Sequence, residues 1–184
     1  MCYAAIMSDN SSPTSPNSYT PESSYHLGDS YSGLRDMLFE TYFHEAREGI
    51  VWGALMEMGR EKGVATLVAL ADGTVSLYLG HGGGILGAGA HEEPQKAARL
   101  FLEAVGYCLY ECEPVNEYPL PKPGHIRFYL LADKGVYSVN APKDDFYSQR
   151  HKLWPLFRYA DNVITQLRLK FPNWGDAGAS QGGS

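Results

Sequence analysis

The sequence predicts a single α+β domain in which three helices pack on an antiparallel sheet of about five strands. Apolar residues repeat with helical spacing in three segments, and alternating runs rich in Val and Thr lie between these segments. Turn signals join neighbouring runs into hairpins. The predicted order is helix, strands, helix, hairpin, helix, which is typical of the α+β class. With 184 residues, of which 44% are hydrophobic, the chain is long enough for one core and short for two domains.

The two ends of the chain differ in composition from its middle. Residues 1–32 are predicted to be a disordered Ser/Pro-rich tail. Residues 8–32 contain almost no aliphatic residues, and such a segment cannot bury enough apolar surface to offset its ordering entropy. Residues 175–184, "GDAGASQGGS", are predicted to be a flexible Gly-rich tail. The folded α+β domain is therefore expected over residues 33–174.

The first half of this domain opens with a helix and continues with strands. In "LRDMLFETYFHEARE", Leu34, Leu38, Tyr42 and Ala46 repeat at helical spacing. The next run, "IVWGALMEM", is either a strand or an extension of that helix, and the strand is favoured because glycine is unfavourable inside a helix. Asp72-Gly73 then separates two apolar runs and predicts a tight hairpin.

The second half repeats this scheme after a long helix in "EPQKAARLFLEAVGYCLYECE". Pro94 fits the first turn of that helix. Its predicted buried face carries Ala97, Leu100, Phe101, Ala104, Val105 and Cys108. The run "HIRFYLLADKGVYSVNA" predicts a second hairpin that turns at Asp133–Gly135. A last helix is predicted to begin near Pro155 and to bury Leu156, Tyr159, Val163 and Leu167.

The two hairpin segments are similar to each other. "ATLVALADGTVSLYLG" and "IRFYLLADKGVYSVNA" have the same pattern, and a loop and a helix follow each of them, which indicates a pseudo-repeat. The succession of elements over residues 34–170 resembles the roadblock and profilin-like folds. The stretches "VATLVALADGTVSLY", "GGGILG" and "VITQLRL" are also similar to a family of small bacterial proteins. Neither resemblance implies a catalytic residue.

Charge and cysteine content exclude several classes of protein. The net charge is −6 and the Lys and Arg residues are scattered, so we expect no nucleic-acid surface and no membrane surface. The chain shows no signal-peptide pattern and no apolar run long enough to span a bilayer, so a cytoplasmic protein is expected. Cys108 and Cys112 lie one helical turn apart, but no second ligand pair accompanies them. We expect no bound metal and no cofactor.

The segment "LGHGGGILGAGAH", residues 79–91, is the one candidate ligand-binding loop, with His81, Gly82, Gly83, Gly84 and His91 as its candidate residues. It matches part of a dinucleotide fingerprint, but the next helix begins too late and carries two glutamates at its start, which repel an anion. The H-G-G-G stretch matches part of an esterase oxyanion motif. However, the only G-x-S-x-G stretch lies in the C-terminal tail, with no acid or histidine after it. We therefore expect the glycines chiefly to let the chain turn.

These observations favour a non-catalytic protein-interaction or regulatory module over an enzyme. Its partner would be another protein or a second copy of the chain, and an immunity-type protein is one variety. Trp154 and Phe157, in "WPLF" at the start of the last helix, are candidate interaction anchors. The alternative is a small-ligand sensor or enzyme that uses the loop at 80–91, where His81 and His91 would supply groups that titrate near neutral pH.

Overall fold

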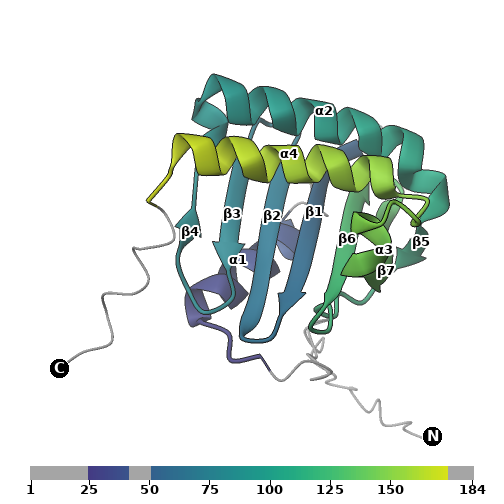
Figure 1. Cartoon of the computed structure of the whole chain (residues 1–184), viewed down its shortest axis with the longest axis horizontal. Helices are drawn as coiled ribbons and strands as arrows, with labels where there is room; N and C mark the ends of the chain where they lie inside the picture. Colours follow the sequence, from purple (N-terminus) through teal and green to yellow (C-terminus); the bar gives the residue numbers. More distant parts are fainter. Residues whose placement is uncertain (1–24, 42–50, 174–184) are drawn as a thin grey trace, which may run out of the picture.

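The structure is a computed structural model that describes residues 25–41 and 51–173. Seven strands and several helices follow one another along the chain (Figure 1). In chain order they are α1 (Asp29–Thr41), β1 (Val51–Arg60), β2 (Gly63–Leu70), β3 (Val75–Leu79), β4 (Gly84–Ile85), the 3-10 helix η2 (Ala88–Ala90), α2 (Glu92–Cys108), the 3-10 helix η3 (Leu109–Glu111), β5 (Glu113–Val115), β6 (His125–Ala132), β7 (Gly135–Pro142), α3 (Lys143–Tyr147) and α4 (Trp154–Lys170).

The strands form one antiparallel sheet in the order β4-β3-β2-β1-β6-β7-β5. The predicted α+β class and antiparallel sheet are confirmed, and residues 51–60 form a strand rather than a longer first helix. The predicted turn at Asp72-Gly73 is also present. There the Thr74 amide donates a hydrogen bond of 2.8 Å to Asp72 Oδ1, and Gly73 has a φ of 93°.

The predicted number of strands, about five, was wrong. The five predicted runs are β1, β2, β3, β6 and β7, and the two further strands are the edges of the sheet, β4 and β5. These strands have only two and three residues, too few to show an alternating pattern. The Pro114 residue in β5 is compatible with an edge position, since proline has no amide to donate to a second neighbour.

The two similar hairpins lie on opposite sides of β1. One hairpin places β2 against β1, and the other places β6 against the opposite edge of β1. This central position explains why most residues of β1 are buried. The two hairpins that are similar in sequence therefore occupy equivalent places in the sheet, each with its first strand paired to β1.

Helices cover both faces of the sheet. Figure 1 shows α2 and α4 side by side across one face and α1 on the other. The layer between the sheet and α2 and α4 contains the larger core cluster, with Phe101, Phe128 and Leu156 fully buried. A second cluster lies beneath α1 and includes Tyr31 and Tyr129.

The three predicted helices correspond to α1, α2 and α4, with differences in detail. Helix α1 begins within the predicted disordered tail, because Tyr31 packs against the sheet and is only 2% exposed. The continuation of the first helical pattern beyond Thr41 lies outside the described residues. Two predicted core residues, Leu100 and Tyr159, are each 41% exposed, since the buried stripes of α2 and α4 pass one position away from them. The short helix α3 was not predicted.

None of the helices within residues 25–41 and 51–173 has the length and apolar character needed to cross a membrane.

Candidate functional site

The glycine-rich segment forms the hairpin between β3 and the edge strand β4. The Gly82 amide donates to the Leu79 carbonyl at 2.9 Å, and the Leu79 amide donates to the Gly83 carbonyl at 3.0 Å. Gly82, Gly83 and Gly84 have φ values of 103°, 81° and 153°, which favour glycine. A Cβ atom at Gly84 would lie 2.2 Å from the Leu77 carbonyl oxygen. The glycines therefore let the chain reverse and pair closely with β3.

The two histidines of this segment lie in different surroundings among the described residues. His81 is exposed in the hairpin turn. His91 is half-buried at the start of α2, where its ring lies edge-on to Phe171 with 5.3 Å between centroids. A small pocket of about 200 Å³ does adjoin Gly82, Gly83 and Gly84, but neither histidine lines it.

Trp154 and Phe157 lie at the start of α4, as predicted, but they face inward. Phe157 is 4% exposed and packs against Phe146 with 5.5 Å between ring centroids. Trp154 is half-buried and packs against the larger core cluster. Phe157 therefore belongs to the core layer, whereas Trp154 remains partly exposed beside it.

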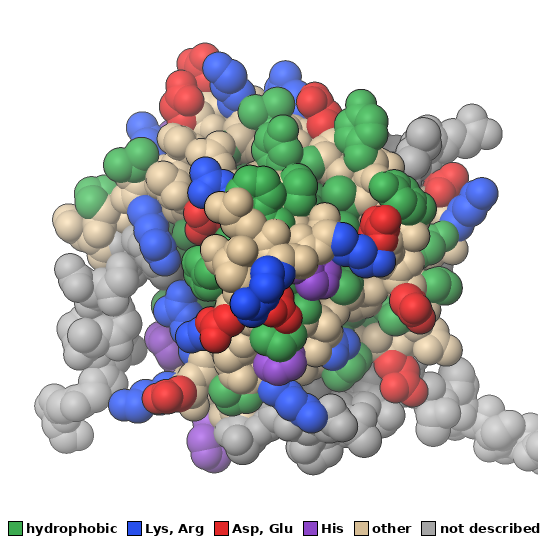
Figure 2. Space-filling view, turned by 45° about the vertical axis from the view of Figure 1, so that its right-hand side comes forward, with side chains coloured by type: hydrophobic (Ala, Val, Ile, Leu, Met, Phe, Trp, Pro, Cys, Tyr) green, Lys and Arg blue, Asp and Glu red, His purple; other side chains and the backbone are tan. Residues whose placement is uncertain are grey.

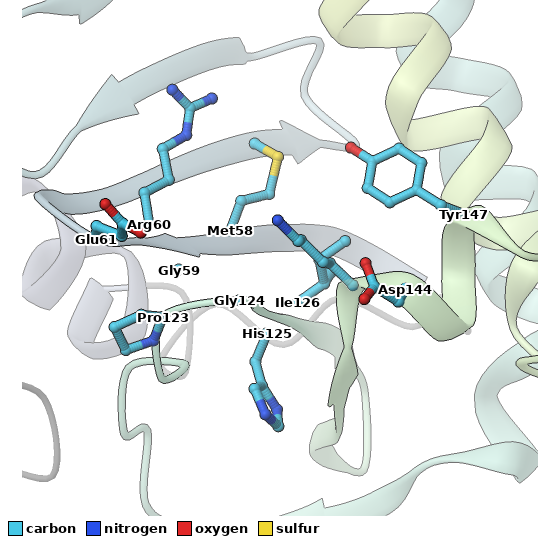
Figure 3. A pocket seen from close by; sticks show the side chains of 11 residues that line it. Met58, Gly59, Arg60, Glu61, Pro123, Gly124, His125, Ile126, Asp144 and Tyr147 are labelled. Carbon is cyan, nitrogen blue, oxygen red and sulfur yellow. The ribbon is translucent and has the colours of Figure 1, made fainter.

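A groove of about 810 Å³ opens at one end of the sheet, beside α3 (Figure 3). Three segments that are distant in the sequence line it. They are the end of β1 with the following turn (Met58–Glu61), the start of β6 with the residues before it (Pro123–Ile126), and α3 (Lys143, Asp144 and Tyr147). No pattern in the sequence predicts this groove.

Backbone hydrogen bonds hold the three segments together. The Gly124 amide donates to the Gly59 carbonyl at 3.0 Å, and the Lys143 amide donates to the Gly124 carbonyl at 2.9 Å. Gly124 has a φ of 77°. A Cβ atom at Gly59 would lie 2.1 Å from the Lys122 carbonyl oxygen, so the chain segments approach as closely as a glycine allows. The shape of the groove is therefore set by the backbone.

The groove combines an apolar floor with polar walls. Ile126 is 2% exposed and Met58 is half-buried. Figure 3 shows the Tyr147 ring and the Met58 side chain pointing toward one another, with Arg60 on the far side of Met58. Tyr147 is 64% exposed and its ring lies edge-on to Phe157. The His125 side chain points away from Met58 and Tyr147, and its Nδ1 lies 3.3 Å from Asn140 Nδ2.

The cations that line the groove have no partner among the described residues. Arg60 and Lys143 are exposed, and neither forms an ion pair with the described part of the chain. Glu61 and Asp144 also line the groove, so its charged groups include both signs. On the face shown in Figure 2, basic and acidic side chains are likewise interspersed.

A histidine fixes the connection from α3 to α4 behind this groove. The Leu153 amide donates to His151 Nδ1 at 3.1 Å, and the His151 ring packs on Phe146 with 4.4 Å between centroids. Burial lowers the pKa of His151, which Asp145 partly offsets and Lys152 reinforces. The neutral ring is therefore the form that fits the folded protein.

This arrangement predicts a pH-dependent loss of stability. Because the pKa of His151 is lower in the folded than in the unfolded chain, protonation favours unfolding as the pH falls below about 6.5. Urea unfolding at pH 7.5 and pH 5.5 is expected to show a larger loss of stability for the wild type than for His151→Asn. If His151→Asn loses as much stability between pH 7.5 and pH 5.5 as the wild type does, protonation of His151 is not the cause of the loss.

An ion pair is buried between α1 and the sheet. Arg35 and Glu57 are 1% and 0% exposed. Arg35 Nε donates to Glu57 Oε1 at 2.7 Å, and Arg35 Nη2 donates to the Tyr118 carbonyl at 2.7 Å. Burial alone lowers the pKa of Arg35, but the charge and hydrogen bonds of Glu57 outweigh burial and raise that pKa above its ordinary value. The pair ties α1 to β1.

The sequence contained a signal for this ion pair. Glu57 interrupts the apolar run of β1, and Arg35 lies between Leu34 and Leu38 on the helical stripe. A charged residue at each of these positions requires a partner when both segments are buried.

The two described cysteines are predicted to be poorly reactive. Burial raises the pKa of Cys112 to about 12 and also raises the pKa of Cys108. Because the thiolate is the nucleophile, we expect Cys112 in a Cys2→Ser background to alkylate at least about tenfold more slowly in the folded than in the unfolded protein at pH 8. Timed iodoacetamide labelling with peptide mass spectrometry measures this ratio, and equal rates would refute it.

Neither the metal-ligating side chains nor a comparison with known proteins assigns a further site. Within the described residues, no group of three or more His, Cys, Asp or Glu side chains is placed to hold a metal ion. No protein family, no curated protein and no solved structure matches the chain.

Proposed function

We propose that the protein is a non-catalytic interaction module that binds a segment of a partner protein in the groove between β1, β6 and α3. The observation that carries this proposal is the lining of the groove, in which Tyr147 and Arg60 lie beside an apolar floor that includes Met58. Aromatic residues, Met and Arg are the types enriched at protein interfaces.

The arrangement of these side chains favours a protein segment as the occupant. An interface has an apolar centre and a polar rim. Here Ile126 and Met58 form the centre. The exposed Arg60 and Lys143, which form no ion pair with the described part of the chain, belong to the rim. An extended segment would match the centre by placing an apolar side chain on Met58. It would match the rim by placing an acidic side chain near Arg60 and Lys143. The rigid backbone of the groove lowers the ordering cost of binding.

The fold supports a docking role by analogy. An antiparallel sheet with helices on both faces is compatible with the proposed relation to the roadblock and profilin-like folds. The partner is another protein, as for an immunity-type protein, or a second copy of this chain. We further propose that the protein acts in the cytoplasm. Fold-level analogy does not identify the partner. The partner is identified by what binds in the groove.

Site-specific cross-linking in the cells that produce the protein tests this function. A photoreactive phenylalanine analogue replaces Tyr147 in the groove, and a matched variant carries it at Tyr159 on the outer face of α4. The expected result is one adduct of defined mass at position 147 that is missing at position 159. Mass spectrometry then distinguishes a second copy from another protein. Equal adducts at both positions, or none at 147, would contradict the proposal.

A further inference from the structure

We infer that the pocket between α1 and the glycine hairpin binds one small, uncharged aromatic molecule. This pocket has a volume of about 200 Å³. It shares no lining residue with the groove, so it is a second site that stands or falls independently of the proposed interaction.

Two structural elements form the walls of the pocket. The first half of α1 contributes Tyr31 and Leu34, and the β3–β4 hairpin contributes Tyr78 and the Gly82–Gly84 turn. Leu86, which is 61% exposed, lies at its edge. The pocket therefore joins a helix and a sheet edge that are far apart in the sequence.

The walls are held in place without any ligand. The Gly28 amide donates to the Gly80 carbonyl at 2.8 Å, which fixes the chain just before α1 to the end of β3. The hydroxyl groups of Tyr31 and Thr66 lie 2.7 Å apart and form a buried hydrogen bond. A pocket fixed at two points is already formed when the ligand arrives.

The lining selects an uncharged ligand. Among residues 25–41 and 51–173, no charged side chain lines the pocket. A charged ligand would lose its hydration without gaining a partner. The Tyr31 hydroxyl already forms a hydrogen bond with Thr66, so it is engaged within the protein and does not require a polar ligand.

The size of the pocket and its rings select a single aromatic ring. A cavity of about 150 Å³ lined by apolar side chains is known to accept benzene, so a pocket of 200 Å³ holds one ring with a small substituent. Aromatic rings pack favourably with centroids about 4.5–7 Å apart, and the aromatic residues that line the pocket are Tyr31 and Tyr78, of which only small parts are exposed.

The glycine hairpin contributes the opening of this pocket. A Cβ atom at Gly82 or Gly83 would meet no other atom within 4 Å, so these two positions border open space. The backbone requires glycine there because both residues have positive φ values. The same residues thus turn the chain and leave the pocket unobstructed. The sensor or enzyme predicted as an alternative from the sequence would use His81 and His91. The pocket uses neither histidine, and it binds its ligand without acid–base chemistry.

Titration with benzene and toluene, followed by NMR of the backbone amides, tests the site. The expected result is saturable shifts at the Gly82, Gly83 and Gly84 amides, which fall in the well-separated glycine region of the spectrum. Leu34→Trp should fill the pocket and weaken binding at least tenfold. Met37→Trp is the matched control, because Met37 lies on the same helix, is 50% exposed and does not line the pocket.

A second plugging variant protects the test against misfolding. Leu86→Trp closes the pocket from its exposed edge, so it is expected to weaken binding even if Leu34→Trp does not fold. Linear, non-saturating shifts in the wild type, or unchanged affinity in both plugged variants, would overturn the inference. Neither outcome bears on cross-linking in the groove.

Discussion

Replacing Glu57 with Leu is expected to lower the free energy of unfolding by about 3–5 kcal/mol, because it leaves the buried Arg35 guanidinium without its counter-ion. The substituted side chain has a similar size, so the loss comes from the unpaired charge rather than from a cavity. Urea unfolding of the wild type and the variant at pH 7 measures this difference.

The double variant Arg35→Met with Glu57→Leu is the control. It removes both charges together, so most of the lost stability is expected to return. A double-mutant cycle over the four proteins isolates the pairwise energy. A loss of less than about 1 kcal/mol for Glu57→Leu, as is typical of exposed ion pairs, would contradict the buried position of the pair.

Gly84→Ala is expected to cost about 2–4 kcal/mol, because it combines an unfavourable φ with a clash against backbone. The new Cβ would lie 2.2 Å from the Leu77 carbonyl oxygen. Leu77 lies in the buried strand β3 and cannot easily move. The clash is therefore expected to be relieved by a shift of β4, which separates from the sheet. Hydrogen exchange should then be faster at the amides that join β3 and β4.

Gly83→Ala is the matched control within the same turn. Gly83 also has a positive φ, but its added Cβ meets no atom within 4 Å. We therefore expect a cost of only about 1–2 kcal/mol and an intact β3–β4 pairing. Equal losses in the two variants would show that close approach to β3 is not what requires glycine at position 84.

Local sequence patterns were sufficient to predict the main elements of the fold. Asp72-Gly73 and Asp133–Gly135 predicted both long hairpins, because the tight turns depend on residues adjacent in the chain. Helical periodicity predicted α1, α2 and α4 for the same reason. The edge strands β4 and β5 left no such pattern, since two or three residues form strands only when a neighbour supplies the hydrogen bonds.

The sites depended on contacts that the sequence does not display. The groove joins residues 58–61, 123–126 and 143–147, and the Arg35–Glu57 pair joins a helix to a strand. The residues of the groove are ordinary in their own segments and acquire their role only through the fold. Glu57 does interrupt an apolar run, but only the fold identifies Arg35 as its partner. Conversely, Phe157 was a candidate anchor because it is an aromatic residue at the start of a helix. Its packing against Phe146 buries it.

The most direct test of the proposed function is the affinity of the purified partner for groove variants. Once cross-linking at position 147 has identified the partner, isothermal titration calorimetry compares the wild type with Arg60→Glu and Tyr147→Ala. Arg99→Glu, an exposed charge reversal on α2, is the control. The groove proposal predicts that both groove variants bind at least tenfold more weakly and that the control binds like the wild type. Unchanged affinity in both groove variants would show that the partner binds elsewhere.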